Sequence, residues 1–333
     1  MLEGIFWALI AGLTLGLYAL PEKYTRDFEF ENTWGLFFLI NTFIIPNIAA
    51  FLLIDNFTEV LAAIPAGVLT GMVVSSLLWG VGMMMWGKAI NHIGLSLGFS
   101  LFIGTIILVG SLIPFMIEGL PDTHVFLTIM LGILVVLVGV ITNGRAGILR
   151  QKDEGEEIGK DGMIKGIAIA VIGGLLATGF SYANTVGGAI ISQAVVAQGN
   201  PQWVSAVGIM YVIYMAGGVA TAIYFITTLT KKGLWGRFKT PHLSNNLLMT
   251  TIMALFNFAA SGFFAYAAFK LGSIGGTVGY AIFNTTSVAV AIITGIITKE
   301  WVRASAPAKT SLYWGLACMI AGIVIVAVGN GLV

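Results

Sequence analysis

Five amide and aromatic side chains stand near the middle of long apolar stretches of this sequence. They are Asn41, Trp79, Tyr214, Asn257 and Asn284. Amides both donate and accept hydrogen bonds, and they therefore suit a neutral, hydroxyl-rich ligand. An indole or phenol ring can lie against the apolar face of such a ligand or of an aromatic compound. We predict that these five residues bind a neutral small molecule; the alternative for each is a contact between helices.

Few ionisable groups accompany these residues. His92 follows Lys88 by one helical turn, and histidine is the side chain that titrates near neutral pH, so His92 is a candidate for carrying a coupled proton. The alternative is a pair at the membrane interface, with the lysine reaching toward water. Glu22 and Glu300 each stand beside a lysine at the end of an apolar stretch, and we interpret both as interfacial charges.

Motifs of soluble enzymes and metal sites are missing from the sequence. It contains no HExxH, no Walker phosphate loop, no clustered Cys and His at metal-ligand spacing, and no pair of carboxylates within an apolar stretch. The sequence therefore predicts neither an enzyme nor a bound metal or cofactor.

Composition indicates the class of protein. Of the 333 residues, 58% are hydrophobic and 9% are charged, and the mean hydropathy is +0.96. A water-soluble fold of this length cannot bury so many apolar groups, so lipid must be the solvent. A net charge of +1 gives no reason to expect nucleic acid as a partner. The single cysteine, Cys318, excludes an intramolecular disulfide.

Apolar runs of about 20 residues are long enough to cross a bilayer as helices, and the sequence has ten of them. They cover residues 4–20, 33–53, 66–90, 93–117, 124–142, 163–184, 202–228, 246–268, 273–297 and 309–329. We expect residues 185–200 either to extend the sixth run or to form a separate surface helix. The sequence thus predicts an all-α polytopic membrane protein with ten transmembrane helices.

Basic residues are concentrated in alternate connections. Every Lys and Arg except Lys270 lies in or beside the first, third, fifth, seventh or ninth connection between these runs. Basic residues in short loops are retained in the cytoplasm, so these five connections are predicted to be cytoplasmic. Both termini are then predicted to lie on the opposite side.

A long polar connection divides the chain into two sets of five spans. We predict a first five-helix repeat over residues 1–142, a cytoplasmic linker over 143–162, and a second repeat over 163–333. Because five is odd, the second set enters the membrane from the opposite side, and any relation between the halves is inverted.

Two predicted hairpins support this division. The sequence over residues 86–114 has two apolar arms joined at Asn91-His92-Ile93-Gly94, and residues 264–292 form a weaker echo. Ala89, Gly94 and Gly98 in the first correspond to Ala267, Gly272 and Gly276 in the second. Small residues at four-residue spacing allow close helix contacts.

Several segments carry a resemblance to a known family. EGIFWALIAG with LYALPEKY at the start, LWGVGMMMWGKAINHIGLSLG with LVGSLIPF in the first hairpin, and KEW at Glu300 resemble the L-rhamnose:proton symporter family of the drug/metabolite transporter superfamily. The resemblance covers nearly the whole chain. It implies a ten-span transporter of the bacterial inner membrane, with a sugar as substrate and protons as the driving ion.

The resemblance is incomplete at two places. Met83 and Met85 stand where the family has amides, and Gly275 to Thr286 replace acidic and histidine side chains in the ninth span. We therefore expect a secondary transporter that moves a small sugar or related neutral metabolite by alternating access, with the coupled proton left open. The alternative is an exporter of amphiphilic metabolites or drugs. The sequence leaves the oligomeric state open.

The charge distribution predicts the topology. A reporter that is active only in the cytoplasm should be active when it is fused within residues 143–165 and inactive when it is fused after Val333. Cytoplasmic activity at the C-terminus would contradict the assignment.

Overall fold

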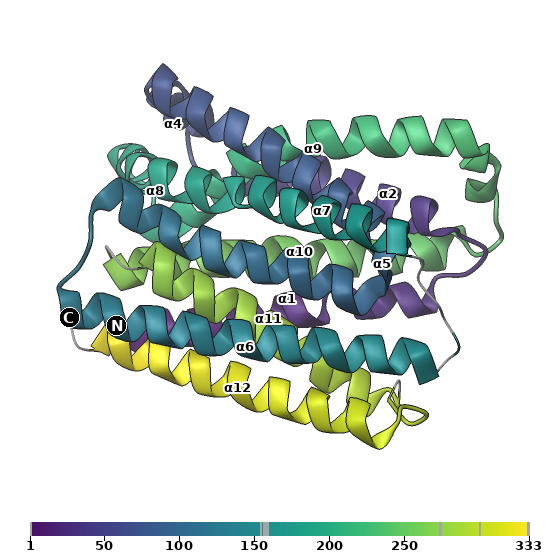
Figure 1. Cartoon of the computed structure of the whole chain (residues 1–333). Coiled ribbons are helices and arrows are strands. Elements are labelled where there is room, and N and C mark those ends of the chain that lie inside the picture. The colour runs from purple at the N-terminus through teal and green to yellow at the C-terminus, as the bar shows by residue number, and fades with distance from the viewer. Residues whose placement is uncertain (1, 154, 156–159, 273–274, 300, 332–333) are drawn as a thin grey trace.

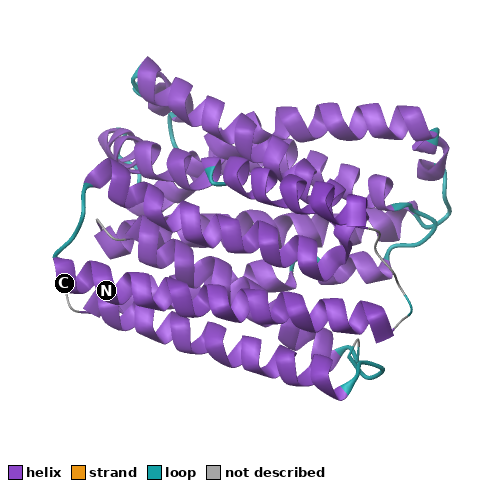
Figure 2. Ribbon diagram, viewed as in Figure 1, coloured by secondary structure: helices purple, strands orange, loops and turns teal. Residues whose placement is uncertain are grey.

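The computed structural model describes residues 2–153, 155, 160–272, 275–299 and 301–331. Helices form almost all of this part of the chain, and no strand occurs in it (Figures 1 and 2). In the first half they are α1 (Leu2–Leu17), η1 (Leu20–Tyr24), α2 (Phe30–Leu39), η2 (Ile40–Ile44), α3 (Ile45–Leu53), α4 (Phe57–Ala62), α5 (Ala66–Glu118) and α6 (Thr123–Asp153).

The second half of the chain continues the bundle. Its helices are α7 (Lys160–Ala177), α8 (Gly179–Ala197), η3 (Gln202–Val204), α9 (Ser205–Lys232), η4 (Leu234–Phe238), α10 (Leu243–Leu271), η6 (Gly275–Gly279), α11 (Tyr280–Ile297) and α12 (Ala306–Gly331). α1 begins and α12 ends at the same end of the bundle (Figure 1). This is the arrangement expected of an even number of membrane crossings.

Most of the predicted spans correspond to long apolar helices. The described part of the chain contains nine helical stretches long and apolar enough to cross a membrane, and a shorter apolar helix over Leu101–Ile117 takes the place of the fourth predicted span. Of the two expectations for residues 185–200, the structure supports extension, because α7 and α8 together form one candidate span, Gly162–Ala197.

α5 contains the predicted first hairpin. Its backbone is helical from Ala66 to Glu118, yet the rings of Trp86 and Phe102 stack with centroids 6.1 Å apart. In a straight helix, residues 16 positions apart would be separated by about 24 Å. Gly173 of α7 lies against both Met85 and Phe102, so the two arms of α5 pack side by side on α7. The prediction of a hairpin in this region is confirmed.

The described part of the chain has two π-helical turns, η2 near the middle of the candidate span Phe30–Leu53 and η6 at the start of Gly275–Ile297. η2 precedes Pro46, which has no backbone N–H and so cannot complete the regular helical ladder. The five residues of η2 include Asn41 and Thr42, both buried. η6, rich in glycine, precedes α11 in the same way. Such bulges re-aim side chains within a helix and are frequent at functional sites.

Glycines bring α6 and α12 into backbone contact. A Cβ on Gly139 would lie 2.7 Å from the carbonyl oxygen of Gly315, and one on Gly322 would lie 2.8 Å from that of Gly132. No side chain fits at these positions unless the helices separate. Lipid is as apolar as the surfaces of these helices, so the hydrophobic effect does not drive the helices together. Small residues stabilise the α6–α12 pair because they allow close van der Waals packing.

We expect Gly139→Ala to lower the free energy of unfolding by about 1 to 3 kcal/mol, the usual cost of overpacking. Thermal unfolding in detergent would measure the effect. Gly262→Ala in α10 is the control, since a Cβ there meets nothing within 4 Å, and alanine favours the helix. Equal stability of the two variants would contradict the prediction, because it would mean that α6 and α12 can move apart to accept the methyl group at no cost.

Candidate functional site

Three of the predicted site residues form one hydrogen-bonded cluster. The Asn41 side chain donates from Nδ2 to Oδ1 of Asn257 at 2.9 Å, and the Tyr214 hydroxyl donates to the same oxygen at 2.8 Å. Ser261 Oγ lies 2.5 Å from the Tyr214 hydroxyl and completes the cluster. The four residues come from η2, α9 and α10, and the three predicted ones stand near the middle of their candidate spans.

The local sequence explains how these side chains meet. The π-helical turn before Pro46 places Asn41, which is 1% exposed, on the inner side of its span. Asn257 and Ser261 are four residues apart on α10, so both face the same neighbour. That neighbour is Tyr214, which is also 1% exposed. Ser261 is buried as well, whereas Asn257 is half-buried, so the cluster is polar and lies largely within the protein.

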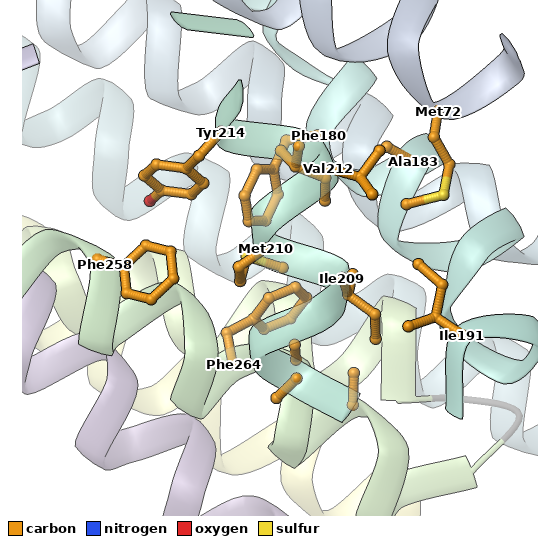
Figure 3. Close-up of a cluster of buried hydrophobic side chains, with 14 of the residues drawn as sticks. Met72, Phe180, Ala183, Ile191, Ile209, Met210, Val212, Tyr214, Phe258 and Phe264 are labelled. Atoms are coloured by element: carbon orange, nitrogen blue, oxygen red, sulfur yellow. The ribbon is translucent and has the colours of Figure 1, made fainter. Parts of the chain in front are cut away.

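Aromatic rings surround the cluster. Trp79 lies 5.3 Å from Tyr214 between ring centroids, and Phe258 approaches Tyr214 edge-on at 5.4 Å. The indole of Trp79 rests directly on Gly217 of α9, where a side chain would overlap the ring. Tyr214, Phe180, Phe258 and Phe264 belong to the same buried group (Figure 3). A ligand that reached the cluster would meet polar atoms beside flat apolar faces.

One acceptor of the cluster is unused. Among the described residues, the buried Oδ1 atom of Asn41 has no hydrogen-bond partner. A buried acceptor left without a donor costs about 1 to 3 kcal/mol. A hydroxyl group that donated a hydrogen bond to Oδ1 of Asn41 would recover this free energy.

Asn284 borders the same core from another side. Its side-chain amide donates to the backbone carbonyl of Tyr280, one turn earlier, at 2.9 Å. The Tyr280 ring stacks with Phe180 at 6.4 Å, and Phe180 in turn contacts Trp79 at 5.7 Å. Asn284 is therefore joined to the cluster through aromatic packing and not through a hydrogen bond.

His92 lies apart from these residues. Its Nδ1 atom is 2.9 Å from the carbonyl oxygen of Lys88, and its Cβ packs against Gly166 of α7. It lies thirteen positions after Trp79 in α5, a distance of about 20 Å along a helix. His92 thus belongs to the bend of the hairpin.

The residues that the structure describes include no group of three or more His, Cys, Asp or Glu side chains placed to hold a metal ion. The chemistry available at the cluster is hydrogen bonding by amides and hydroxyls, together with stacking.

Comparison with known proteins identifies the family. The model of the L-rhamnose-proton symport protein family (RhaT) matches residues 1–333. The L-rhamnose-proton symporters of Escherichia coli (strain 55989 / EAEC) and Shigella boydii serotype 18 (strain CDC 3083-94 / BS512) are each 26% identical over 337 residues. Each alignment covers 98% of this chain and 97% of the relative. The chain belongs to the L-rhamnose-proton symport family.

Membership in the L-rhamnose-proton symport family makes the chain a secondary transporter and not an enzyme, as the sequence predicted. It also makes the chain a multi-pass membrane protein, in agreement with the apolar helices. The family is one of sugar and proton symport.

Sequence analysis missed the contacts of two polar residues, Ser261 and Glu22. Ser261 joins the cluster, and its position one turn after Asn257 was the available signal. Glu22, interpreted as an interfacial charge, lies at the end of the first candidate span and accepts a hydrogen bond from the indole of Trp34 at 2.7 Å. Glu22 and Trp34 are 12 positions apart on different elements, so no pattern in the sequence indicates this contact.

Proposed function

We propose that this protein carries a neutral monosaccharide of the L-rhamnose class into the cell together with a proton, by alternating access. The observation that supports the proposal is the hydrogen-bonded cluster of Asn41, Tyr214, Asn257 and Ser261 near mid-membrane. We take the sugar and the proton from the L-rhamnose-proton symporters to which the chain is similar. Binding near the midplane, between sets of helices, is the usual arrangement in secondary transporters.

The cluster has the chemistry to recognise a sugar. Amide and hydroxyl groups can each donate hydrogen bonds to sugar hydroxyls or accept hydrogen bonds from them. The Oδ1 atom of Asn41, which has no partner among the described residues, can accept a hydrogen bond from a sugar hydroxyl. Trp79 supplies a flat apolar face for the ring carbons. L-Rhamnose is a 6-deoxy sugar, so its methyl group also needs apolar surroundings. In our proposal Asn284 contributes from the opposite border of the aromatic core.

We propose further that residues 1–142 and 163–333 are inverted repeats joined by the linker 143–162. Equivalent contacts in the two halves support this. A Cβ on Gly12 would meet the side chain of Thr286 and the carbonyl oxygen of Phe283, and one on Gly174 would meet Thr105 and Phe102 in the same way. The first helix of each half thus packs on the hairpin of the other.

Other contacts repeat the pattern. Gly4 lies against Leu271 near the turn after α10, and Gly166 lies against Ile93 at the bend of α5. Gly4 and Gly166 are as far apart in sequence as Gly12 and Gly174. The pairing of α6 with α12 joins the last helix of one half to the last helix of the other. Such exchange of equivalent partners is expected of two repeats related by a two-fold axis.

For the orientation we propose a bacterial inner-membrane location with both termini outside the cytoplasm. The alternate placement of the basic residues supports this choice. The connections that carry these residues then face the cytoplasm, where an imported sugar and its proton are released.

We expect Asn257→Ala and Asn41→Ala to weaken L-rhamnose binding by about 1 to 3 kcal/mol, or roughly 5- to 150-fold in Kd. Either change removes one partner of a buried hydrogen bond and leaves polar atoms unpaired. Binding of radiolabelled sugar to purified protein in detergent would measure the effect, beside a panel of other neutral sugars and cationic aromatic compounds.

Asn47→Ala is the matched control. Asn47 lies on the same span as Asn41, but its amide donates to the carbonyl of Phe43 in its own helix and to the sulfur of Met215. It should leave binding within about twofold of the unmodified protein. Unchanged sugar affinity in folded Asn41→Ala and Asn257→Ala would refute the site. Binding of cationic aromatics but of no sugar would favour the exporter alternative.

A further inference from the structure

A proton symporter needs a side chain that binds and releases the proton, and Glu22 has the surroundings for this task. Glu22 lies in η1, at the end of the first candidate span, Leu2–Tyr24, and its side chain is half-buried. Its Oε1 atom accepts a hydrogen bond of 2.7 Å from Nε1 of Trp34, which is 5% exposed. The carboxyl group is thus held by a fixed, neutral donor from the next span.

Glu22 has no ion-pair partner, whereas four other carboxylates among the described residues have one. Among the described residues, ion pairs join Glu31 to Lys232, Glu29 to Arg237, Asp27 to His242, and Glu3 to Lys270, but none involves Glu22. Protonation of a paired carboxylate would give up the attraction of its partner. Glu22 can gain or lose a proton without breaking an ion pair.

The groups around Glu22 come from η1, the turn before it, α2 and α10. Tyr18, in the turn between α1 and η1, packs its ring against Trp34, and Lys23 follows Glu22 in η1, with Nζ donating to Thr298 at 3.3 Å. From α2 come Trp34 and, one turn earlier, Glu31, which pairs with Lys232. From α10, which packs against η1, the side chains near this segment are neutral: Asn245, Met249 and Ile252.

Tyr18 packs against the donor of the hydrogen bond to Glu22. Its ring contacts Trp34 edge-on at 6.0 Å and Phe37 at 5.6 Å. The indole that holds the carboxyl group is thus itself held within a group of aromatic rings from the end of the first span and from the second.

We propose that Glu22 is the residue that binds the symported proton. This inference rests on the proposed function. The proton adds to the carboxylate at Oε2 while Oε1 keeps its bond to Trp34, and the resulting neutral acid releases it to water on the cytoplasmic side. A neutral carboxylic acid can enter apolar surroundings far more readily than a carboxylate. Protonation therefore allows the end of α1 to move against α2 and α10 as the sugar site changes sides.

Two transport assays in proteoliposomes test the role of Glu22 in the full chain. Accumulation of L-rhamnose driven by an imposed pH gradient requires net proton movement, whereas counterflow of L-rhamnose between preloaded and external pools does not. We expect Glu22→Gln to lower gradient-driven accumulation more than tenfold and to keep counterflow within about threefold of the unmodified protein. Glu22→Asp should restore part of the accumulation.

Two further variants serve as comparisons. Glu29→Gln removes a carboxylate at the same end of the molecule, from an exposed pair with Arg237, and should leave both assays unchanged. His92→Gln tests the residue that the sequence indicated for proton coupling, and we expect it too to keep both activities. Loss of accumulation with intact counterflow in His92→Gln, but not in Glu22→Gln, would overturn the proposal.

The pH dependence of sugar binding provides a readout that does not need transport. In detergent, the Kd for L-rhamnose of the unmodified protein should change with pH, and Glu22→Gln should abolish most of that change. If Glu22→Gln accumulates sugar normally, or binds it with the original pH dependence, then Glu22 is not the proton site. Absence of L-rhamnose counterflow in the unmodified protein would instead refute the proposed function.

Discussion

Inside a bilayer, a polar side chain must find its hydrogen-bond partner within the protein, and the central cluster of this molecule follows from that constraint. Asn41, Tyr214 and Asn257 come from three different spans, and none of them can be satisfied by lipid. Their mutual bonds at 2.8 and 2.9 Å fix the distance between η2, α9 and α10. The ring of Trp79 packs against Tyr214 beside them, and the buried Oδ1 atom of Asn41 has no hydrogen-bond partner among the described residues.

Glycine contacts provide the framework around this cluster. The spans share no hydrophobic driving force in lipid, so they hold together where backbones approach closely. Gly139 with Gly315, and Gly132 with Gly322, fasten α6 to α12. Gly217 allows Trp79 to lie flat against α9, next to Tyr214. The absence of a side chain at glycine therefore both permits close helix packing and allows Trp79 to lie beside the candidate site.

Much of the fold could be predicted because lipid imposes simple rules on length and charge. Apolar runs located the helices, and the hairpin over residues 86–114 was visible from its two arms and short turn. Mid-span position also selected Asn41, Tyr214 and Asn257. The hydrogen bond of Asn284 to its own helix could not be predicted, because it depends on which face of α11 turns inward. The contact of Glu22 with Trp34 depends on the path of the chain between α1 and α2, which has no periodic pattern.

In the function and two-repeat architecture that we propose, the position of the cluster explains how sugar binding favours a change of state. Asn41 belongs to the first half, whereas Tyr214, Asn257 and Ser261 belong to the second, so the bond between Asn41 and Asn257 crosses the boundary between the halves. Breaking that bond in an empty protein would leave buried polar atoms without partners, at a cost of about 1 to 3 kcal/mol each. A sugar hydroxyl can donate to one amide and accept from the other, and it thereby replaces the broken bond. The halves can then separate at the cluster with little loss when sugar is bound, which is the differential interaction between states that a transporter requires.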